Sequence, residues 1–382
     1  MSPRSNTALA RLDLVLADAQ RRVRRALGRI EGVQLVAYRS WVTPSQAVVL
    51  GRVVQADLAL EEQLDRWPRV VRVAHERFWT LGAQPVQVRA SWEGQEAILS
   101  SDSGGFIDVS FPLRGAPPAS STRAELALAG TPSPGSVAVQ VFGLRPGAAF
   151  GVISDIDDTV LETELTNPWR RFLQLIYSRQ PMRLPFDGIA ALYQAFTRAN
   201  NPIFYVSNAP WNLYEHVVEL LDHHDIPRGP VLLRDSRLTE RVVRDPVSGQ
   251  LQVHKQRALR RIVEEHPNLP FVLLGDSSRR DPLRYVEVAE AFPGRVAAIY
   301  IRRVHGLLAR RGSLADLVQR AARAGVELVI ADDTVTMAKH ARSRGFVPAE
   351  EVGRVREGKA RDEQAPPVEL GGEAAAHAGD PR

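Results

Sequence analysis

The chain of 382 residues contains no cysteine. Disulfide bonds, zinc–thiolate centres and thiol nucleophiles are therefore excluded, and this absence is compatible with a reducing cytosol. No apolar run approaches the length of a membrane span, and the N-terminus lacks the apolar core of a secretory signal. These absences lead us to expect a cytoplasmic protein.

Several catalytic motifs are also missing. The sequence has no P-loop, no Gly-x-Ser-x-Gly and no His-Glu-x-x-His. Arginine greatly outnumbers lysine, but the formal net charge is only +5. That excess suits an anionic substrate or surface and is too small to indicate nucleic acid, so we expect no nucleic-acid partner. Nothing in the sequence identifies a protein partner.

The most informative stretch is 150–160, which runs Phe-Gly-Val-Ile-Ser-Asp-Ile-Asp-Asp-Thr-Val. A short apolar run ends in Asp155, Asp157 and Asp158, which predicts a buried strand that opens onto a site at its carboxyl end. Carboxylates this close raise one another's pKa unless a cation is bound. Mg²⁺ prefers hard oxygen ligands, so the pattern predicts a Mg²⁺ site, with a plain acidic loop as the alternative.

Three later stretches place polar residues in the same manner. They are Ile203–Val206 followed by Ser207-Asn208, Lys255 at the start of a helical pattern, and Phe271–Leu274 followed by Gly275-Asp276 and Asp281. In this order the chain resembles the haloacid dehalogenase superfamily of phosphohydrolases. The words Tyr-Val-Ser-Asn-Ala-Pro-Trp at 205–211 and Gly-Asp-Ser at 275–277 make it similar to the actin-patch phosphatidate phosphatase family. The resemblance covers roughly residues 148–305.

The resemblance implies a role for each residue of the first motif. Asp155 would be the nucleophile that forms an aspartyl-phosphate, and Asp157 would act first as general acid and then as base. Asp155, Asp157 and Asp276 would hold Mg²⁺, Asp157 through its backbone carbonyl. Thr159 would fix the turn that follows, whereas Asp158 is interpreted as a solvated or capping acid.

The later motifs would bind the phosphoryl group. Ser207 and the amide of Asn208 would hold phosphoryl oxygens, although a serine after a strand can also be a simple cap. Lys255 would be catalytic and bind the phosphate, and the nearby phosphate and carboxylates would offset its unfavourable place at the positive end of a helix dipole. The alternative is a surface lysine. Asp281 would hold a metal-bound water or position Lys255.

The pattern of apolar residues divides the chain into four segments. We expect a basic amphipathic helix at 1–32, a small all-β sandwich at 33–147, an α/β domain at 148–345 and a largely disordered tail at 346–382. The first helix can lie on an anionic membrane surface or pack on the protein with its arginines in solvent. The localisation would then be cytoplasmic, with a possible peripheral contact to a membrane.

The α/β domain is predicted to be a doubly wound, mostly parallel sheet of the haloacid dehalogenase type. Its strands are expected at Gly151–Ser154, Ile203–Val206, Val231–Leu233, Phe271–Leu274, Val296–Ile301 and Val326–Ile330. The inserts Glu162–Asn200 and Arg234–Val253 are too short to form a full cap domain. The site would be open, which suits a bulky or interfacial substrate.

Two other polar clusters are interpreted as structural. Asp222-His223-His224-Asp225 resembles a metal box, but adjacent histidines at a helix end splay apart, so we predict a solvated helix terminus. Asp332-Asp333-Thr334 follows the last strand and is predicted to be a helix cap, with a place at the pocket rim as the alternative.

Together the motifs predict a Mg²⁺-dependent phosphatidate phosphatase-like hydrolase that converts a phosphomonoester, by resemblance phosphatidate to diacylglycerol. Residues 1–146 would present the lipid and take no part in the chemistry. The alternatives are a phosphatase of a soluble phosphomonoester and a non-catalytic scaffold that binds partners through the β domain. A phospho-acceptor receiver domain would not require Ser207 or Gly275-Asp276.

Overall fold

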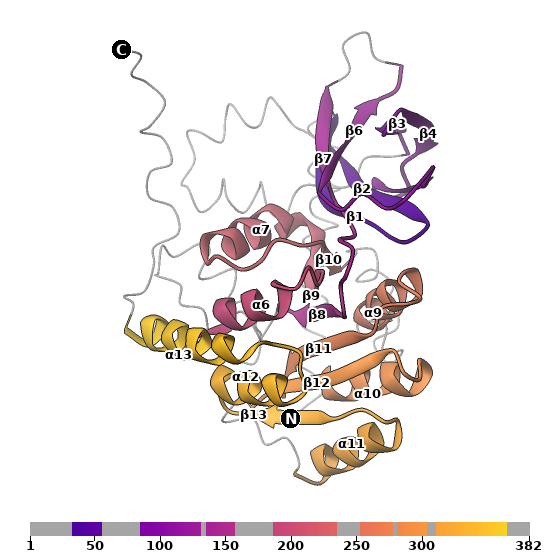
Figure 1. Ribbon diagram of the computed structural model, residues 1–382. Helices are drawn as coiled ribbons and strands as arrows, with labels where there is room; N and C mark the ends of the chain where they lie inside the picture. The colour runs from indigo at the N-terminus through magenta and orange to yellow at the C-terminus, as the bar shows by residue number, and fades with distance from the viewer. Residues whose placement is uncertain are drawn as a thin grey trace, which may run out of the picture.

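The computed structural model describes residues 33–55, 85–130, 135–156, 186–234, 253–277, 281–303 and 311–364. These residues build two sheets that follow one another along the chain (Figure 1). The predicted N-terminal helix at 1–32 lies outside the described residues, as does most of both predicted inserts.

The N-terminal sheet has seven strands in the order β4-β3-β6-β7-β1-β2-β5. The strands are β1 (Val33–Val42), β2 (Gln46–Gln55), β3 (Gln87–Trp92), β4 (Gln95–Ser100), β5 (Phe106–Pro112), β6 (Thr122–Leu128) and β7 (Ser136–Phe142). Every pair is antiparallel except β1 and β7, which run parallel. All seven strands lie within the all-β segment predicted at 33–147.

The expected β-sandwich is not confirmed. Strand β1 pairs with β2 on one side and with β7 on the other, so all seven strands form one continuous sheet and not two stacked ones. The sheet curls in a barrel-like manner (Figure 1), and its two edge strands approach each other where the Gln95 side chain donates to the Pro112 carbonyl at 3.0 Å. The physical reason is that β1 forms hydrogen-bonded pairs on both of its edges, with β2 along its length and with β7 at Ser40 and Trp41.

Alternation along β2 divides its side chains between two cores. Val49 and Val53 belong to the cluster inside the curled sheet, together with Trp92 and Phe111. Val48 and Leu50 face the other way and join the core of the α/β domain. Because successive residues of a strand point to opposite faces, one strand serves both cores.

The second sheet has six strands in the order β10-β9-β8-β11-β12-β13, and every neighbouring pair is parallel. The strands are β8 (Gly151–Asp155), β9 (Ile203–Pro210), β10 (Val231–Arg234), β11 (Phe271–Asp276), β12 (Val296–Arg302) and β13 (Leu328–Ala331). All six lie where the apolar runs predicted them. In chain order the arrangement is 3-2-1-4-5-6, the doubly wound order, with its switch point between β8 and β11.

Helices cover both faces of this sheet (Figure 1). They are α6 (Ile189–Thr197), α7 (Tyr214–His223), α9 (Val253–Glu265), α10 (Asp281–Ala291), α11 (Arg311–Arg323), α12 (Thr334–Ser343), α13 (Ala349–Gln364) and the short 3₁₀ turn η1 (Trp211–Leu213). Helices α6, α12 and α13 contact one another, and α10 contacts both α9 and α11.

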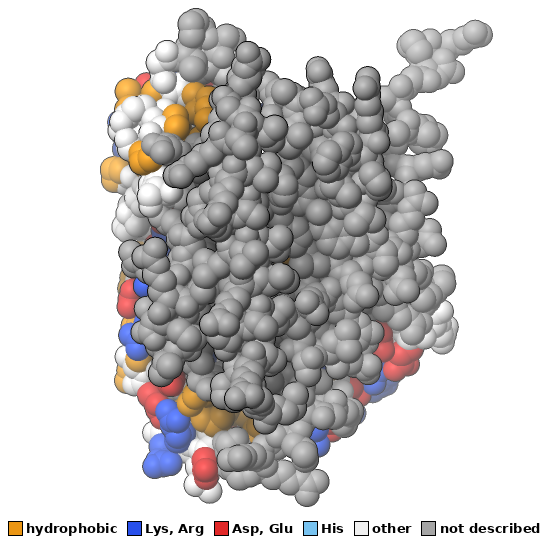
Figure 2. All heavy atoms as spheres, turned by 180° about the vertical axis from the view of Figure 1, so that it is seen from behind, with side chains coloured by type: hydrophobic (Ala, Val, Ile, Leu, Met, Phe, Trp, Pro, Cys, Tyr) orange, Lys and Arg blue, Asp and Glu red, His pale blue; other side chains and the backbone are white. Residues whose placement is uncertain are grey.

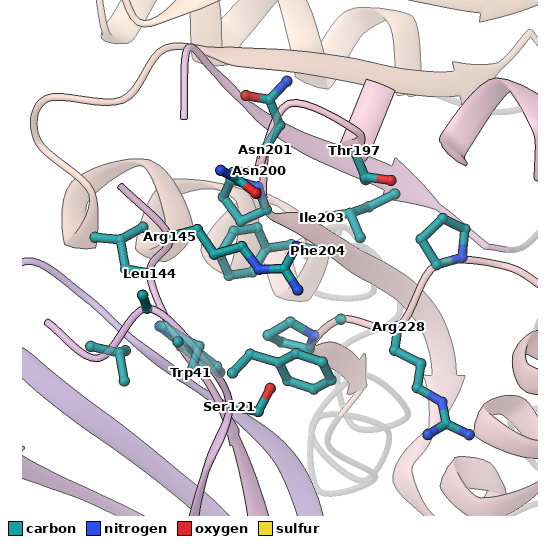
Figure 3. Close-up of a pocket in the computed structure, with 18 of the residues that line it drawn as sticks. Trp41, Ser121, Leu144, Arg145, Thr197, Asn200, Asn201, Ile203, Phe204 and Arg228 are labelled. Atoms are coloured by element: carbon teal, nitrogen blue, oxygen red, sulfur yellow. The ribbon is translucent and has the colours of Figure 1, made fainter. Parts of the chain in front are cut away.

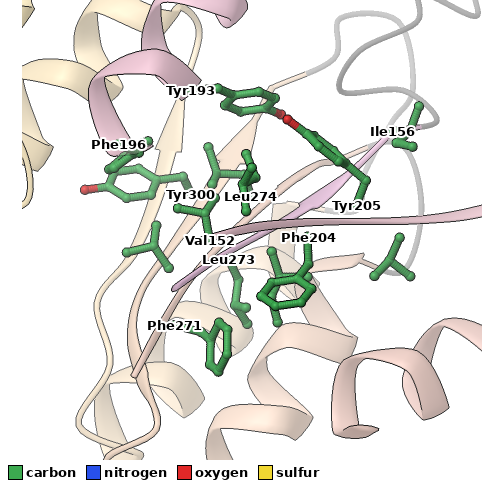
Figure 4. Close-up of a cluster of buried hydrophobic side chains, with 14 of the residues drawn as sticks. Val152, Ile156, Tyr193, Phe196, Phe204, Tyr205, Phe271, Leu273, Leu274 and Tyr300 are labelled. Atoms are coloured by element: carbon green, nitrogen blue, oxygen red, sulfur yellow. The ribbon is translucent and has the colours of Figure 1, made fainter. Parts of the chain in front are cut away.

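The sheet is apolar on both faces, as a parallel sheet under two helix layers must be. Strands β8 and β11 are buried at every position. Aromatic rings pack on both faces of the sheet (Figure 4). On one face Tyr193 and Phe196 of α6 lie near Tyr300, and on the other Phe204 and Phe271 lie toward α9. The buried central strands β8 and β11 give the strand ends that carry the motif residues fixed positions.

The curled sheet packs tightly against the α/β domain. Tyr38 of β1 stacks on Trp211 of η1 with ring centroids 4.2 Å apart, and Trp41 of β1 is buried against Phe204 of β9. The Arg261 guanidinium of α9 donates to both oxygens of Asp108 at 2.6 and 2.9 Å. The two sheets therefore share one hydrophobic core.

The prediction of a largely disordered tail at 346–382 is wrong for residues 349–364, which form helix α13. The helix has few apolar residues, so its sequence shows no helical periodicity of apolar residues. Val352 and Val355 are nevertheless buried, and the helix contacts α6 and α12. Buried Glu351 forms an ion pair with the Arg198 Nε at 3.0 Å. Contacts with the rest of the fold therefore stabilise helix α13, because its own sequence has too few apolar residues to form a clear amphipathic pattern. Residues 365–382 lie outside the described residues.

In the described part of the chain, no helix is long and apolar enough to cross a bilayer. Where described residues are visible from behind, basic and acidic side chains lie side by side (Figure 2). This mixed surface is compatible with the predicted absence of a nucleic-acid partner, which stays a prediction.

Candidate active site

The register of the parallel strands gathers the motif residues at one edge. Asp155, the last residue of β8, lies opposite Val206 of β9, and Ser154 lies opposite Leu274 of β11. Ser207 and Asp276 therefore follow these positions at the same carboxyl edge. Because β8 and β11 flank the switch point, this is the place where doubly wound sheets bind ligands.

Lys255 bridges two of the carboxylates. Its ammonium lies 2.7 Å from Oδ1 of Asp155 and 2.8 and 2.9 Å from the two oxygens of Asp281. All three side chains are fully buried. Lys255 is in the first turn of α9, as predicted, and the two carboxylates offset the unfavourable helix dipole there. It is not a surface lysine.

Asp281 is the first residue of α10, where the positive end of the helix dipole favours an anion. Burial is the largest single effect and opposes its ionisation, but the charges of Lys255 and Arg284 together with hydrogen bonds outweigh it and lower the pKa of Asp281. The contact with both of its oxygens places Asp281 where it can position Lys255, which is one of the two roles the sequence left open.

Asp276 completes an acidic centre. Carboxylate oxygens of Asp155, Asp276 and Asp281 lie within 4.8 Å of one another, and it is the one such group of potential metal ligands found among the described residues. Three buried carboxylates face two cations, Lys255 and the Arg284 guanidinium 3.5 Å from Asp281, so one negative charge remains in excess, which is costly in a low dielectric. Hard oxygen donors and this charge fit a divalent cation such as Mg²⁺.

The predicted phosphate-binding residues occupy the neighbouring strand. Ser207 is buried on β9, and its Oγ accepts the backbone N–H of Ala209 at 2.9 Å. This hydrogen bond is the cap that the sequence offered as the alternative role of the serine, and it fixes the backbone beside Asn208. Both residues lie at the carboxyl edge next to Asp155.

Asp157, Asp158 and Thr159 lie outside the described residues, so their predicted roles stay predictions. Of the two other clusters, Asp333 is the N-cap of α12, as predicted, and its Oδ1 accepts the Thr336 N–H at 2.8 Å. Asp222 near the end of α7 binds arginines and belongs to no metal-ligand group in the described part of the chain.

Gly275 and Tyr285 pack next to the carboxylates of Asp276 and Asp281 and help to fix the backbone there. The Tyr285 hydroxyl donates to the Leu274 carbonyl at 2.7 Å, and its ring lies against Gly275. A Cβ on Gly275 would come within 2.8 Å of the Tyr285 ring and 3.2 Å of the Asp281 Cβ. Only glycine therefore allows this tyrosine and the start of α10 to approach β11 so closely.

Ser154 and Tyr193 were not identified from the sequence. Ser154 is buried beside Asp155, and its Oγ lies 2.5 Å from the Tyr193 hydroxyl on α6. The two groups link α6 to the end of β8 and so help to fix the backbone of Asp155. A serine inside an apolar strand was the only local signal, and its partner lies 39 residues away.

The fold and the centre define a doubly wound α/β domain with a lysine-bridged acidic site at the switch point of its sheet. Within that class, residues 150–303 match the family model described as phosphatidate phosphatase APP1, catalytic domain. The match confirms, for this segment, the family resemblance drawn from the motifs.

Two curated proteins are similar over the same region. Phosphatidate phosphatase APP1 of Saccharomyces cerevisiae is 28% identical over 156 residues, which cover 40% of this chain and 26% of that protein. An uncharacterized protein of Schizosaccharomyces pombe is 26% identical over 156 residues, which cover 41% and 25% respectively. The chain therefore spans about a quarter of the length of these relatives.

Among solved structures, a carbohydrate acetylesterase from Xanthomonas citri aligns with a TM-score of 0.29 at 11% identity. The alignment covers 86% of this chain and 74% of that chain. An overlap this poor carries no argument about fold or function.

Proposed function

We propose that the α/β domain is a Mg²⁺-dependent phosphatase that hydrolyses a phosphomonoester through an aspartyl-phosphate intermediate. The observation that carries the proposal is the buried contact of Lys255 with Asp155 and Asp281 at the switch point. An ionised carboxylate held beside an ammonium is a nucleophile whose charge and orientation are fixed before substrate arrives. The family match of residues 150–303 supports phosphatase activity in general.

In the first step, a carboxylate oxygen of Asp155 attacks phosphorus and the bond to the leaving oxygen breaks. The departing alkoxide takes a proton from Asp157, and Lys255 with Ser207 and the Asn208 amide holds the phosphoryl oxygens. In the second step, Asp157 removes a proton from water, which attacks the phosphorus of the aspartyl-phosphate. Inorganic phosphate leaves and Asp155 is restored.

Asp155, Asp276 and the backbone carbonyl of Asp157 are proposed to hold Mg²⁺. When bound, the cation would offset the negative charge of the carboxylates and of the phosphoryl group. Asp281 lies close enough to the same centre to take part, but its two contacts with Lys255 favour a positioning role.

The proposed substrate class is a phospholipid, with phosphatidate giving diacylglycerol and phosphate. The name of the Saccharomyces cerevisiae relative supports this choice. A substrate in a bilayer would require peripheral contact with a membrane surface, and this contact is part of the proposal. A soluble phosphomonoester is the alternative that the same chemistry allows.

The test is phosphate release by the full chain from short-chain phosphatidate, lysophosphatidate, sugar phosphates and nucleotides, each with Mg²⁺ and with excess chelator. We expect release only with Mg²⁺ and fastest from phosphatidate. Fastest release from a sugar phosphate or nucleotide would instead make the enzyme a soluble phosphomonoesterase. No release from any substrate would leave the scaffold alternative.

Asp155→Asn and Asp276→Asn should each abolish phosphate release while the cooperative unfolding transition remains. Asp316→Asn is the matched control, because Asp316 is exposed on α11 far along the chain from the motifs. Metal-dependent activity retained by Asp155→Asn would contradict the covalent mechanism.

A further inference from the structure

A pocket of about 400 Å³ lies near the amino ends of the parallel strands, whereas the candidate active site lies at their carboxyl ends. It is formed where the curled sheet meets the amino ends of β9 and β10, at Ile203 and Gly229. Ile203 begins the strand that carries Ser207, and four residues of strand span roughly 13 Å. The pocket is therefore separate from the carboxylate centre, and it lies at a junction of the kind that often binds small molecules.

The walls of the pocket are largely apolar. Trp41 comes from β1, Phe142 from the end of β7, and Ile203 with Phe204 from β9 (Figure 3). His266 also lines it, and burial lowers the pKa of its imidazole. A ligand body that fits these walls is apolar and compact.

The charged groups of the pocket are all of one sign. No aspartate or glutamate lines it among the described residues, whereas Arg145 and Arg228 do. In Figure 3 the Arg145 side chain points toward the other labelled residues, and the Arg228 side chain points away from them. Arg145 is exposed and has no ion-pair partner within the described residues. Its charge is therefore available to a ligand.

The charge of Arg228 is only partly compensated. Its guanidinium lies 3.0 Å from Asp222, but Nη2 of buried Arg39 already donates to both oxygens of that carboxylate at 2.7 and 2.8 Å. Two guanidinium groups share one carboxylate, which leaves one positive charge in excess. Together with Arg145, this excess makes the rim of the pocket cationic.

We propose that this pocket binds an amphipathic organic anion, with a compact apolar body against Trp41 and Phe204 and a carboxylate, sulfonate or phosphate group at Arg145 and Arg228. The volume is in the range of pockets that bury most of a small organic ligand. A charge-assisted hydrogen bond to a guanidinium would orient the anionic group. The proposal does not depend on the function assigned to the carboxylate centre.

The test is isothermal titration calorimetry of the full chain with decanoate and with 2-naphthalenesulfonate, neither of which is a phosphomonoester. We expect binding of one equivalent of at least one probe, weaker at high salt because exposed charges are screened. Arg145→Gln should weaken binding by roughly twofold to fivefold, the loss expected for one exposed charged contact. Ser121→Trp, which places a ring in the pocket, should abolish it.

Arg89→Gln is the matched control, since Arg89 is exposed on β3 and does not line the pocket. Thermal unfolding establishes that each variant is folded, and if Ser121→Trp is not, Arg145→Gln and the salt dependence decide. Tighter binding of decanoate would identify an acyl chain as the apolar body, and tighter binding of the naphthalene probe a ring system. The proposal is overturned if neither probe binds, if Arg145→Gln binds like wild type, or if decanol or inorganic sulfate binds as tightly.

Discussion

Lys255 shows how one buried cation organises the candidate site. An ammonium with no exposed surface is tolerated only where anions replace its water, and Asp155 and Asp281 do so at 2.7 to 2.9 Å. The same contacts orient the proposed nucleophile. Removing the lysine would take away the ammonium that lies between Asp155 and Asp281, next to the carboxylate of Asp276.

We therefore expect Lys255→Met to abolish phosphate release and to lower the free energy of unfolding by about 3 kcal/mol in chelator, the usual cost of breaking a buried ion pair. Added Mg²⁺ should restore part of that stability, because it would replace the missing positive charge. Urea unfolding with and without Mg²⁺ measures both effects. Lys339→Met, at an exposed position of α12, is the control. Equal stability of Lys255→Met and wild type in chelator would contradict the expectation.

The proposed acid and base roles of Asp157 predict different kinetic effects of its substitution on alkyl and aryl phosphates. As general acid it is needed for a poor alkoxide leaving group, an effect worth about 10²–10⁴-fold, but not for an acidic phenol. As base it is needed to hydrolyse the aspartyl-phosphate from any substrate. Asp157→Asn should therefore fail in the first step with alkyl phosphates, and should give a burst of about one phenol per site with nitrophenyl phosphate, followed by slow turnover.

Rapid-quench kinetics would measure the burst, and the phosphorylated protein should be stable in acid and labile to hydroxylamine. Equal loss of rate on both substrates without a burst would exclude the acid–base role. Asp157 would then be at most a metal ligand.

At the scale of elements, helix α13 holds the segment that leads into α6. The Gly188 N–H donates to Asp362 of α13 at 2.7 Å, and the Asp187 carbonyl accepts the Thr334 hydroxyl at 2.7 Å. Gly188 has a φ of 80°, and a Cβ there would meet the Thr334 oxygen at 2.7 Å. The helix thus fixes the start of α6, whose Tyr193 reaches Ser154 beside the proposed nucleophile.

The ion pair between Asp333 and Lys359 joins α12 to α13 at 2.8 Å. Burial opposes ionisation of Asp333, but hydrogen bonds from Lys359 and Thr336 outweigh it and lower its pKa from 3.8 to about 2. A depressed carboxyl pKa contributes stability above the unfolded value, and that stability is lost as the pH falls from about 4 toward 2. The pair should therefore matter at neutral pH and not in acid.

Lys359→Met should lower the free energy of unfolding by about 0.5–1 kcal/mol at pH 6, a modest value because both side chains are partly exposed. The difference from wild type should shrink as the pH falls below about 4. Urea unfolding at several pH values measures it, with Lys339→Met as the control. A difference that persists unchanged at pH 3 would show that the lysine acts through packing alone.

At the scale of the molecule, the curled sheet shares a core with the α/β domain that carries the candidate site. Trp41 and Tyr38 belong to the same buried core as β8 and β9, and Trp41 Nε1 donates to Glu265 of α9 at 2.8 Å. Trp211, which directly follows the Ser207 motif, is stacked on Tyr38. The sequence-based hypothesis gave residues 1–146 only a presenting role, and the shared core argues for a structural one as well.

A protein truncated to begin at Gly147 should consequently lose cooperative unfolding, because aromatic and aliphatic surface of β9, η1 and α9 would be exposed to water. Activity on a soluble aryl phosphate and on phosphatidate in vesicles should fall in parallel. Circular dichroism melts and both assays test this. A folded truncated protein that keeps only the aryl phosphatase activity would restore the presenting role.

The sequence by itself determined the parallel sheet and the edge where its polar residues gather. Each of its strands is a short apolar run, and burial on both faces makes such a run visible without knowledge of its neighbours. Parallel strands bring their carboxyl ends together. The convergence of Asp155, Ser207 and Asp276 could therefore be predicted, although they belong to three separate sequence motifs. The cap at Asp333 was equally local.

Tertiary structure decided what depends on contacts between distant residues. Strand β6 is rich in residues with weak strand preference, and β1 is held by partners on both sides, so neither had a decisive local pattern. Helix α13 is stabilised by its contacts with α6 and α12. The curled sheet contacts the α/β domain through pairs such as Arg39 and Asp222, which are 183 residues apart. Periodicity reports which face of a segment is buried, whereas only the folded chain establishes what buries it.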